Sequence, residues 1–409
     1  MPGSERRPAS TLPGRLAVAS VTHAVARLSS KVAPSFEPIA SMDLATLQET
    51  LRLAQESQRV LATRVGRWDY LRFSHKFQCF SEGTVVFDRR FIWGYPKIGR
   101  ILRLEPGLRV QFGQAFWVEE KIDGYNVRIF RRGDEILALT RRGYVCPFTT
   151  DRLQDLLDLR IFAEHPELVL CAEVAGPENP YNEGSPPFIQ EDVRLFIFDL
   201  MRQNSPGFLP YREKQRLLET YGLAGVPAFG HYRADDREAL NSLVCRLDQE
   251  GREGLVFKED SPRDHRVKYV TGRINLSDIR VSEGGFQQLP PEYVLHRILR
   301  LALFLDEHEL VPTAALYQEL GRSLLVGTLD AIQQYQAQHK VCHTFRCRFR
   351  QRTNAELFLQ ALEHLLGKGQ VRRNHLEQVD DFWQLEFVKV LPRATGLLGH
   401  ILGGGIVFD

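Results

Sequence analysis

The stretch Glu119–Arg128 (EEKIDGYNVR) holds the residues of this chain that are best suited to chemistry. On an extended strand, the side chains of Glu119, Lys121 and Asp123 point to the same side, and Gly124 would let the backbone approach a bulky ligand closely. A lysine that lies beside other cations and is partly desolvated loses its proton more easily and becomes a nucleophile. Its natural target would be an electrophilic phosphorus. For these residues alone, a surface hairpin with a salt bridge is an equally good interpretation.

Five further groups of residues follow this lysine in a fixed order and favour the catalytic interpretation. They are Thr140–Gly143 (TRRG), Leu170–Glu173 (LCAE), Leu195–Asp199 (LFIFD), Glu253–Lys258 (EGLVFK) and Val267–Tyr269 (VKY). The whole set resembles the covalent nucleotidyltransferase superfamily of polynucleotide ligases and RNA capping enzymes. Its members share a lysine nucleophile, two later carboxylates, an aromatic residue that stacks on the base, and distal lysines. The resemblance implies an enzyme that transfers a nucleotide through a covalent lysine adduct.

The surrounding residues resemble one branch of this superfamily, the homodimeric ATP-dependent RNA ligases best known from archaea. The matching segments are Gly94–Ile98 (GYPKI), Tyr125–Arg128 (YNVR), Cys146–Thr150 (CPFTT) and Glu173–Tyr181 (EVAGPENPY). The likeness covers residues 42–409. DNA ligases usually have an arginine five residues after the lysine, where this chain has Asn126, which weakens a DNA ligase interpretation. Arg142 also departs from the branch, which usually has a smaller residue there.

This resemblance implies a reaction in three steps. Lys121 attacks the α-phosphate of ATP, forms a lysyl-AMP phosphoramidate and releases pyrophosphate. AMP then moves to an RNA 5′-phosphate, and an RNA 3′-hydroxyl displaces it, either in trans or to close a circle. The product is a phosphodiester bond between RNA ends. Whether the purpose is repair, splicing or circularisation leaves no trace in the sequence.

The resemblance also implies which residues handle phosphate and metal. Lys258 and Lys268 are the cations expected to act with Lys121 in catalysis, because charge develops on phosphoryl oxygens in the transition state. Glu173 and Glu253 supply hard oxygen ligands for a divalent ion, which we expect to be Mg²⁺, with Mn²⁺ compatible with the same ligands. Glu173 is the stronger candidate, since a lone carboxylate at the end of an apolar strand is costly to bury unless it is paired or metal-bound.

The nucleotide is expected to contact a larger set of residues. These are Glu119, Lys121, Asn126, Arg141, Glu173, Phe198, Lys258 and Lys268. Phe198 would stack on adenine, Glu119 would accept the adenine amino hydrogens, and Arg141 would reach the ribose. Phe198 shares a strand face with Phe196, so core packing is the alternative for its ring. Asp199 is expected to be structural.

Two other classes of function remain open. A DNA ligase or a capping-type guanylyltransferase would use the same core chemistry, although Glu119 favours adenine, because a carboxylate would repel the guanine carbonyl oxygen. A protein that binds RNA ends without catalysis is the non-enzyme alternative. The sequence speaks against it, because every position expected to act keeps its chemical type.

The elements that must position these residues are mostly strands between about Phe73 and Tyr269. The predicted strands are Phe116–Lys121, Asn126–Phe130, Ile136–Thr140, Leu168–Val174, Val193–Leu200, Gly254–Lys258 and Arg266–Val270. Arg132–Glu135 (RGDE) predicts a hairpin turn. Helical spacing predicts helices at Tyr211–Tyr221 and Asp236–Glu250.

After Ile279 the chain is predicted to be largely helical. Pro290–Pro291 marks the start of a helix whose apolar periodicity reaches Leu305, and a second helix runs from Thr313 to about His339. A last unit is predicted to contain the strand His343–Phe349, the helix Asn354–Leu366 and the strand Phe382–Leu391. One face of the helical segment is too apolar to stand alone, so we predict a homodimer.

Together these elements predict an α+β fold with a nucleotidyltransferase core of antiparallel, ATP-grasp-like sheets. A helical dimerisation segment and a small α/β C-terminal unit follow it. The predicted divisions are a tail (1–41), an N-terminal module (42–110) that opens with the helix-like run Leu44–Leu61, an adenylyltransferase domain (111–278), a helical domain (279–340) and a C-terminal domain (341–409).

Composition limits the class of protein. With 409 residues, 43% of them hydrophobic, the chain can bury a large core. The 53 Lys and Arg residues nearly balance the 51 Asp and Glu residues, so any affinity for RNA must come from a local patch, for which Lys97 and Arg100 are candidates. No apolar stretch reaches the roughly 18 residues of a membrane span. Six cysteines without a framework spacing predict reduced thiols. We therefore expect a soluble, cytoplasmic protein.

The first 41 residues are rich in Ser, Ala, Pro and Arg. Three hypotheses compete for this tail: a disordered segment, an organellar targeting peptide, or an upstream start with the functional chain beginning near Met42. The composition favours disorder over targeting.

Overall fold

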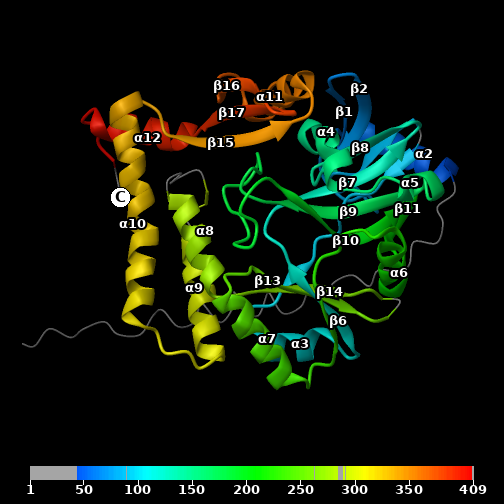
Figure 1. Cartoon of the computed structure of the whole chain (residues 1–409), viewed down its shortest axis with the longest axis horizontal. Helices are drawn as coiled ribbons and strands as arrows, with labels where there is room; N and C mark the ends of the chain where they lie inside the picture. The colour runs from blue at the N-terminus through cyan, green and yellow to red at the C-terminus, as the bar shows by residue number, and fades with distance from the viewer. Residues whose placement is uncertain (1–43, 89, 262, 284–288, 291, 408–409) are drawn as a thin grey trace, which may run out of the picture. The chain divides into compact units, whose positions relative to one another are not determined.

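The computed structural model describes residues 44–88, 90–261, 263–283, 289–290 and 292–407. The tail 1–41 lies outside these residues, so the three hypotheses for it stay predictions. The described part combines four β-sheets with helices in a mixed α+β fold, which confirms the predicted class (Figure 1). The strand pairs are antiparallel, apart from β14 with β5.

The N-terminal module is one helix followed by a four-stranded sheet in the order β1-β2-β3-β4. Its elements are α2 (Leu44–Glu56), β1 (Val60–Val65), β2 (Trp68–Phe73), β3 (Val85–Phe87) and β4 (Arg90–Ile92). The prediction of a helix over Leu44–Leu61 is therefore wrong about where the helix ends. The helix stops at Glu56 because Gln58 adopts a positive φ of 54°, and the apolar, β-branched residues from Val60 then fit a strand.

Two five-stranded sheets form the centre of the fold. The β6 sheet has the order β12-β6-β13-β14-β5, and the β9 sheet has the order β11-β10-β9-β7-β8. The strands of the β6 sheet are β5 (Gly99–Arg100), β6 (Phe116–Lys121), β12 (Ala228–Tyr232), β13 (Gly254–Glu259) and β14 (Arg266–Val270). The strands of the β9 sheet are β7 (Tyr125–Arg132), β8 (Glu135–Thr140), β9 (Leu168–Ala175), β10 (Arg194–Arg202) and β11 (Ser205–Phe208). Every strand predicted for this region is present.

Helices and a tight turn connect these strands. The helices are α3 (Leu104–Gln111), α4 (Pro147–Leu156), α5 (Ile161–Glu164), α6 (Tyr211–Tyr221) and α7 (Arg237–Gln249). The predicted hairpin turn is confirmed, since Arg132 pairs with Glu135 and Gly133 supplies the positive φ of 58° that such a turn requires. The α4 helix was not predicted, although Pro147 occupies its first turn as helix starts favour.

The described C-terminal part contains five helices and a three-stranded sheet in the order β15-β17-β16. Its elements are α8 (Arg273–Glu283), α9 (Glu292–Glu307), α10 (Ala314–Gln338), β15 (Cys342–Phe349), α11 (Arg352–Leu366), β16 (Val371–Val379), β17 (Phe382–Val390) and α12 (Pro392–Leu402). Helical structure begins at Arg273, earlier than predicted, because Leu276 and Ile279 are both buried at helical spacing. The β16 strand escaped prediction because it is an exposed edge strand without apolar alternation.

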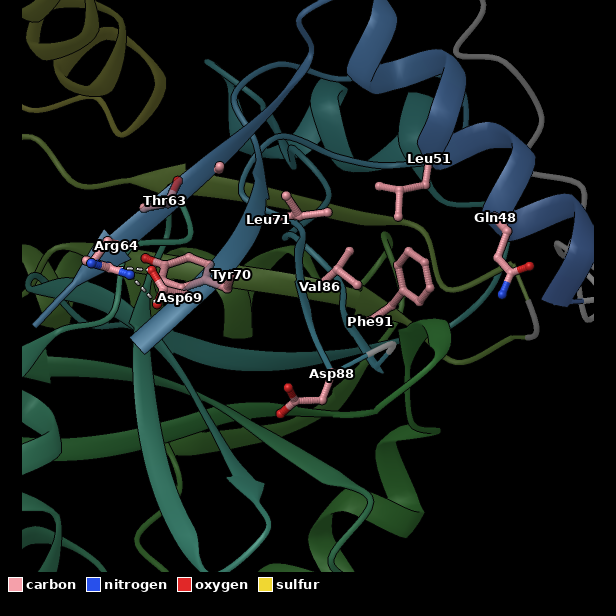
Figure 2. Close-up of a pocket in the computed structure, with 11 residues that line it drawn as sticks. Gln48, Leu51, Thr63, Arg64, Asp69, Tyr70, Leu71, Val86, Asp88 and Phe91 are labelled. Atoms are coloured by element: carbon pink, nitrogen blue, oxygen red, sulfur yellow. Dashed lines mark hydrogen bonds and ion pairs between the residues drawn. The ribbon is translucent and has the colours of Figure 1, made fainter. Parts of the chain in front are cut away.

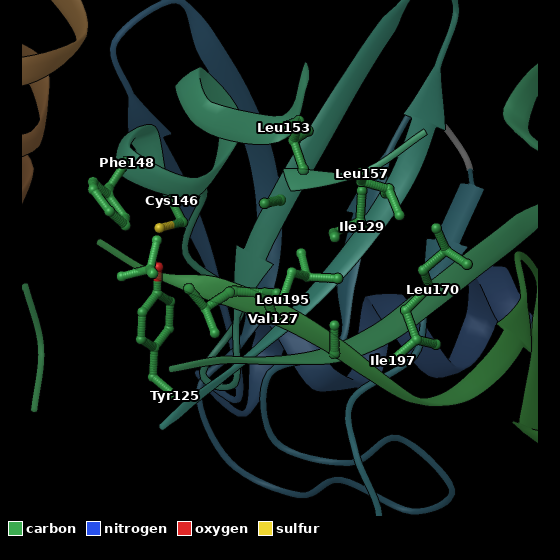
Figure 3. Packing of buried hydrophobic residues seen from close by; sticks show 14 of the residues in the cluster. Tyr125, Val127, Ile129, Cys146, Phe148, Leu153, Leu157, Leu170, Leu195 and Ile197 are labelled. Atoms are coloured by element: carbon green, nitrogen blue, oxygen red, sulfur yellow. The ribbon is translucent and has the colours of Figure 1, made fainter. Parts of the chain in front are cut away.

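One hydrophobic core joins the β9 sheet to the C-terminal sheet. Figure 3 shows its centre, where side chains of β7, β9 and β10 meet those of α4. The same cluster continues into the C-terminal unit through Phe345, Cys347, Phe349, Phe358, Leu385 and Phe387. Phe349 lies 5.4 Å from Phe148 of α4 and 5.7 Å from Phe358 of α11, measured between ring centroids. The C-terminal unit is thus packed on α4 and the β9 sheet by aromatic contacts.

Two expectations from composition can be compared with the described residues. No helix among them is long and apolar enough to cross a membrane. All six cysteines lie in the described part of the chain, and none of them forms a disulfide bond with another described residue.

Replacing Phe349 with alanine tests the shared core. Phe349 is fully buried, so we expect Phe349→Ala to lower the free energy of unfolding by about 3–5 kcal/mol. Guanidinium unfolding followed by circular dichroism measures this change. Leu365→Ala is the control, because Leu365 is 42% exposed on α11 and its truncation should cost less than about 1 kcal/mol. A Phe349→Ala loss no larger than the control would show that the two sheets do not share one core.

Candidate active site

A cavity between the β6 sheet and the β9 sheet brings together nearly all of the predicted site residues. Its volume is about 130 Å³, and the cavity is partly open to solvent. The predicted nucleotide-binding residues that line it are Glu119, Lys121, Asn126, Arg141, Glu173, Phe198, Lys258 and Lys268. Glu253 does not line the cavity but contacts Lys121 at its edge.

The strand register explains why residues distant in sequence meet here. In the β6 sheet, Glu119 is opposite Val256, which is opposite Lys268, and Lys121 is opposite Gly254. Residues opposite one another point to the same face of a sheet, as do alternate residues along one strand. Glu119, Lys121 and Lys268 therefore all point to the face that borders the cavity.

Lys121 is surrounded by carboxylates. Its Nζ lies 2.5 Å from Oε2 of Glu253. Burial disfavours the ammonium, but the negative charges of Glu253, Glu173 and Asp123 outweigh it, so the pKa of Lys121 is raised. The expectation of a lysine with a lowered pKa is wrong for this arrangement of charges, because it considered only neighbouring cations. The surrounding carboxylates thus favour the protonated form of Lys121 in this arrangement of charges.

Two of the carboxyl groups near Lys121 have raised pKa values. Burial raises the pKa of Glu173 to about 8, and the charges of Glu253 and Asp123 contribute to the rise. Burial and Glu253 raise the pKa of Asp123 to about 7. Asn126 lies opposite Glu173 in the β9 sheet and donates a hydrogen bond to it from Nδ2.

The acids therefore fit a divalent cation. Added positive charge would relieve the repulsion between Glu173 and Glu253, and both offer the hard oxygen ligands that Mg²⁺ prefers. Among the described residues, no group of three or more His, Cys, Asp or Glu side chains is placed to hold a metal ion. The two glutamates can thus supply only part of a coordination shell, which suits an ion that keeps several waters and binds phosphate.

A buried network of paired charges forms another wall of the cavity. Oε2 of Glu119 lies 2.5 Å from Nζ of Lys258, and Glu119 also pairs with Lys214 of α6. Nζ of Lys258 lies 3.0 Å from Oδ2 of Asp199, which also pairs with Arg266. Each of these side chains is buried, and burial together with the charge of Lys258 lowers the pKa of Lys214 to about 8. Buried charges are tolerated only when paired in this way.

This network bears on two predicted roles. Lys258 is only 3% exposed and also donates to the backbone carbonyl of Phe198 at 2.6 Å, so a role in binding phosphate stays a prediction. Glu119 is 1% exposed between two ammonium groups, so its contact with adenine is equally untested. Asp199 pairs with Lys258 and Arg266 in this network and also lines the cavity, so its purely structural role stays a prediction.

The sequence did not point to Lys214, although one signal was present. Lys214 occupies the same helical stripe of α6 as the buried residues Leu217, Leu218 and Tyr221. A lysine in an otherwise apolar stripe must find a buried partner, and Glu119 is that partner. A charge on the apolar face of a predicted helix thus marks a buried ion pair.

Phe198 lines the cavity at an irregularity of β10. The register of β10 against β9 shifts between Ile197 and Asp199, so Phe198 is the extra residue of a β-bulge. Its ring lies 5.6 Å from the Tyr95 ring, at an interplanar angle of 44°. The side chain is half-buried among Phe196 and other apolar residues, so it packs against the core and borders the cavity at once.

The structure also shows the surroundings of Gly124 and of the neighbouring arginines Arg141 and Arg142. A Cβ at Gly124 would lie 2.4 Å from the carbonyl oxygen of Val174, so the backbone of β9, and not a ligand, requires glycine there. Arg141 is exposed and lines the cavity, whereas Arg142 has a 79% exposed side chain and does not line it.

A second cavity lies in the N-terminal module, between α2 and the β1-β2-β3-β4 sheet (Figure 2). Arg64 and Asp69 face each other at its rim and form a salt bridge, and much of the remaining lining, such as Leu71, Val86 and Phe91, is apolar. None of the predicted site residues lines this cavity. The chemistry of the chain is concentrated between the two central sheets.

Comparisons with known proteins agree with this location. Residues 114–270 match the family described as RNA ligase, and residues 285–405 match the family described as the C-terminal region of the ligase Pab1020. The chain is also 27% identical over 361 residues to an uncharacterised protein of Methanocaldococcus jannaschii, covering 84% of this chain and 90% of that protein.

Two solved structures match almost the whole chain. A putative ATP-dependent DNA ligase from Aquifex aeolicus is 50% identical, with a TM-score of 0.84, over 88% of this chain and 100% of that one. An archaeal ATP-dependent RNA ligase is 28% identical, with a TM-score of 0.79, over 90% of this chain and 100% of that one. With the cavity at the centre of the matched region, these relatives show that the chain belongs to the family of ATP-dependent RNA ligases known from archaea and is a ligase.

Proposed function

We propose that the protein joins RNA 5′-phosphate and 3′-hydroxyl ends, using ATP and a covalent adenylate on Lys121, and that it can close RNA circles. The observation that carries this proposal is the setting of Lys121. It is a half-buried lysine in a cavity lined by charged side chains, with carboxylates nearby and the cation Lys268 within electrostatic reach. Binding of a nucleotide phosphate and a divalent ion would offset the repulsion among the charged side chains around Lys121.

In the first step, Nζ of Lys121 attacks the α-phosphorus of ATP. An N–P bond forms, and the bond from the α-phosphorus to the bridging oxygen breaks, so that pyrophosphate leaves with the electron pair. Glu253 accepts the hydrogen bond of the Lys121 ammonium, so a divalent ion held by this carboxylate would favour loss of the Lys121 proton to solvent before the attack. Lys268 faces the same side of the sheet and stabilises the charge that develops on the phosphoryl oxygens.

In the later steps, the adenylate moves to RNA and is then displaced. An oxygen of the RNA 5′-phosphate attacks the α-phosphorus, the N–P bond breaks, and Lys121 regains a proton as it leaves. The RNA 3′-hydroxyl then attacks the activated 5′-phosphorus, and AMP departs. Lys121 returns to its pairing with Glu253, so the charge arrangement in the structure corresponds to both the start and the end of the cycle.

Glu173 and Glu253 would hold a divalent ion, which we expect to be Mg²⁺. When bound, such an ion supplies positive charge at the phosphoryl oxygens. The carboxylates that raise the pKa of Lys121 are the same ones that would hold the ion. Neutralised glutamates no longer favour the ammonium form, so the two roles of these side chains are coupled.

A DNA ligase is the second candidate, because the relative with 50% identity is described as a putative ATP-dependent DNA ligase. Asn126 favours RNA over DNA, since DNA ligases usually have an arginine at this position. A capping-type guanylyltransferase has no comparable support. The choice between RNA and DNA is therefore the first to test.

The helical segment supports a homodimer. Its helices expose large apolar side chains, namely Leu295, Leu299, Tyr317, Leu325, Val326 and Leu329. Tyr317 is 63% exposed and Leu325 is 58% exposed, which is costly for a monomer in water. A second copy of the same surface would cover these side chains with a symmetric interface.

The covalent step can be tested with α-labelled nucleotide. We expect wild-type protein with Mg²⁺ to carry label from ATP and not from GTP on a denaturing gel, and Lys121→Ala to carry none, because its nucleophile is gone. Adding unlabelled 5′-phosphorylated RNA should discharge the label, whereas the matching DNA should not. Lys76→Ala is the control, since Lys76 is exposed outside the cavity. Label that survives in Lys121→Ala would refute the assignment, and discharge by DNA alone would favour the second candidate.

The raised pKa of Glu173 predicts a pH-dependent stability. The carboxyl has a pKa near ~4.3 in the unfolded chain and about 8 in the folded protein, so stability present below pH ~4 is lost as the pH rises through 8. Glutamine does not titrate. We therefore expect Glu173→Gln to raise the free energy of unfolding by ~1–3 kcal/mol at pH 8.5 and by less at pH 5, while abolishing adenylylation.

Urea unfolding at the two pH values measures this difference. Glu191→Gln is the control, because Glu191 is exposed and should leave both values unchanged. An equal effect of Glu173→Gln at pH 5 and pH 8.5 would be inconsistent with a buried carboxylate of raised pKa.

The dimer proposal predicts the effect of charges on α10. Leu325 and Leu329 lie one helical turn apart and are 58% and 47% exposed. We expect the double change Leu325→Glu and Leu329→Glu to give a monomer at micromolar concentration in sedimentation equilibrium, where the wild type is a dimer. Val110→Glu, at an 80% exposed position of α3, should stay dimeric. A monomeric wild type would rule the dimer out.

A further inference from the structure

Three cations beside the cavity have no partner among the described residues. Arg100 of β5, Lys268 of β14 and Arg300 of α9 are each partly buried, yet none forms a salt bridge or a side-chain hydrogen bond with a described residue. The other partly or fully buried cations of the cavity, such as Lys258 and Arg266, are all paired. Half-buried cations without partners indicate a site for an anion.

The strand register places two of these cations side by side. Arg100 pairs with Lys268 in the parallel ladder of β5 and β14, and the backbone N–H of Ile101 donates to the carbonyl of Lys268 at 3.0 Å. Arg100 thus continues the row of the β6 sheet that runs from Glu119 through Val256 and Lys268. This row leads from the paired-charge wall of the cavity towards the helical segment.

Helix α9 supplies the third cation and is firmly attached to the catalytic sheets. Phe304 packs in the same core cluster as Tyr269, and a Cβ at Gly272 would lie 2.6 Å from the Phe304 ring. The Glu307 carboxylate accepts hydrogen bonds from the backbone N–H groups of Leu104, at 2.8 Å, and Glu105, at 3.2 Å. The position of Arg300 is therefore fixed by packing one turn away.

A fourth cation, Arg297, lies on the same helical face but is partly neutralised. Its Nε donates to Oδ2 of Asp278 of α8 at 3.0 Å, and its guanidinium stacks on the Tyr293 ring at 3.2 Å from the centroid. Burial and the positive charges of Arg100 and Arg297 lower the pKa of Arg300 to about 10. The guanidinium groups are thus close enough to repel one another. Asp278 offsets part of this repulsion at Arg300, Glu253 offsets part of it at Arg100, and a bound anion would offset more.

We propose that Arg100, Arg300 and Lys268 form a subsite for the β- and γ-phosphates of ATP, and so for the pyrophosphate that leaves when Lys121 is adenylylated. The subsite rests on the proposed function, which puts adenine near Glu119 and Phe198 and the α-phosphate at Lys121. From that base end, the row through Lys268 to Arg100 spans three strand spacings of about 4.8 Å each. An extended triphosphate can follow the same direction.

The surroundings favour pyrophosphate over an RNA chain. A guanidinium offers bidentate hydrogen bonds to phosphate, and the compact, highly charged pyrophosphate matches a compact group of cations. A bound RNA strand would require further cations along its path. On α9, however, the neighbouring exposed side chains include Leu295 and Leu299, at 65% and 50% exposure, and offer no charge.

Pyrophosphate itself is the probe for this subsite. In isothermal titration calorimetry with magnesium pyrophosphate, we expect Arg300→Gln to weaken binding at least about tenfold, the cost of losing one charge-assisted hydrogen bond. Arg300→Lys keeps the positive charge but cannot form bidentate hydrogen bonds, so its affinity for pyrophosphate should lie between those of the wild type and Arg300→Gln. Arg109→Gln is the control, because Arg109 is an exposed arginine of α3 outside the cavity and should bind as the wild type does.

Kinetics separate the leaving group from RNA. We expect Arg300→Gln to slow both adenylylation by ATP and pyrophosphate-driven reversal about tenfold, while sealing of RNA that already carries a 5′-adenylate stays at the wild-type rate. Loss of sealing with normal adenylylation would show that the cations bind RNA instead. Unchanged binding and unchanged rates would overturn the subsite.

A thermal unfolding control excludes a structural role. Removing one of several repelling guanidinium groups should leave the melting temperature unchanged or higher, and pyrophosphate should raise it in the wild type more than in Arg300→Gln. A melting temperature lowered without ligand would assign Arg300 to folding. Because calorimetry needs no turnover, a wild type that binds pyrophosphate but forms no adenylate would refute the proposed function without refuting the subsite.

Discussion

Everything about this site depends on one constraint: charges that are buried between two β-sheets must be neutralised by nearby partners. The two ends of the cavity meet this constraint in different ways. Near Glu119, the protein supplies all the partners itself, through Lys214, Lys258, Asp199 and Arg266. Around Lys121 lie several carboxylates, and nearby are cations that have no partner among the described residues. Under the proposed function, substrates complete the pairing there.

The two ends of the cavity therefore differ in how firmly their charged side chains are held. A fully paired network in a medium of low polarity fixes side-chain positions, because breaking any one pair would leave an isolated buried charge. Under the proposed function, the paired end holds the base in one orientation. At the Lys121 end, repulsion among the carboxylates of Glu173, Asp123 and Glu253 is an electrostatic cost that the folded protein carries until positive charge arrives. Sites that pre-organise charge for a reaction carry such a cost in general.

The sequence was informative where local patterns determine structure. Alternation and turn residues predicted the strands that carry Lys121, Glu173 and Phe198. The order of the motifs identified the residues that line the cavity. It was uninformative where structure depends on distant partners. Lys214 and Arg266 pair with acids far away in the chain, and no spacing rule reveals such pairs. The exposed edge strand β16 lacks alternation because neither of its faces is buried as a whole.

The raised pKa of Lys121 is the clearest case of this limit. Seen along the chain, Lys121 has acidic neighbours on its own strand. The decisive carboxylates, however, are those of Glu253, which immediately precedes β13, and Glu173 of β9, and the pairing of the strands brings them to Lys121. The direction of a pKa shift depends on the sum of charges in space, and a sequence motif fixes only some of them.

The same reasoning gives the helical segment a part in the chemistry. Its helix α9 exposes Leu295 and Leu299 to solvent, while Phe304 anchors it on the catalytic sheets. A helix fixed in this way transmits position between its two faces, because packed interiors deform little. If a second copy covers the exposed leucines, the dimer contact bears on the same rigid helix that holds Arg297 and Arg300 beside the cavity. Assembly and the charge balance around the phosphates would then depend on a single element.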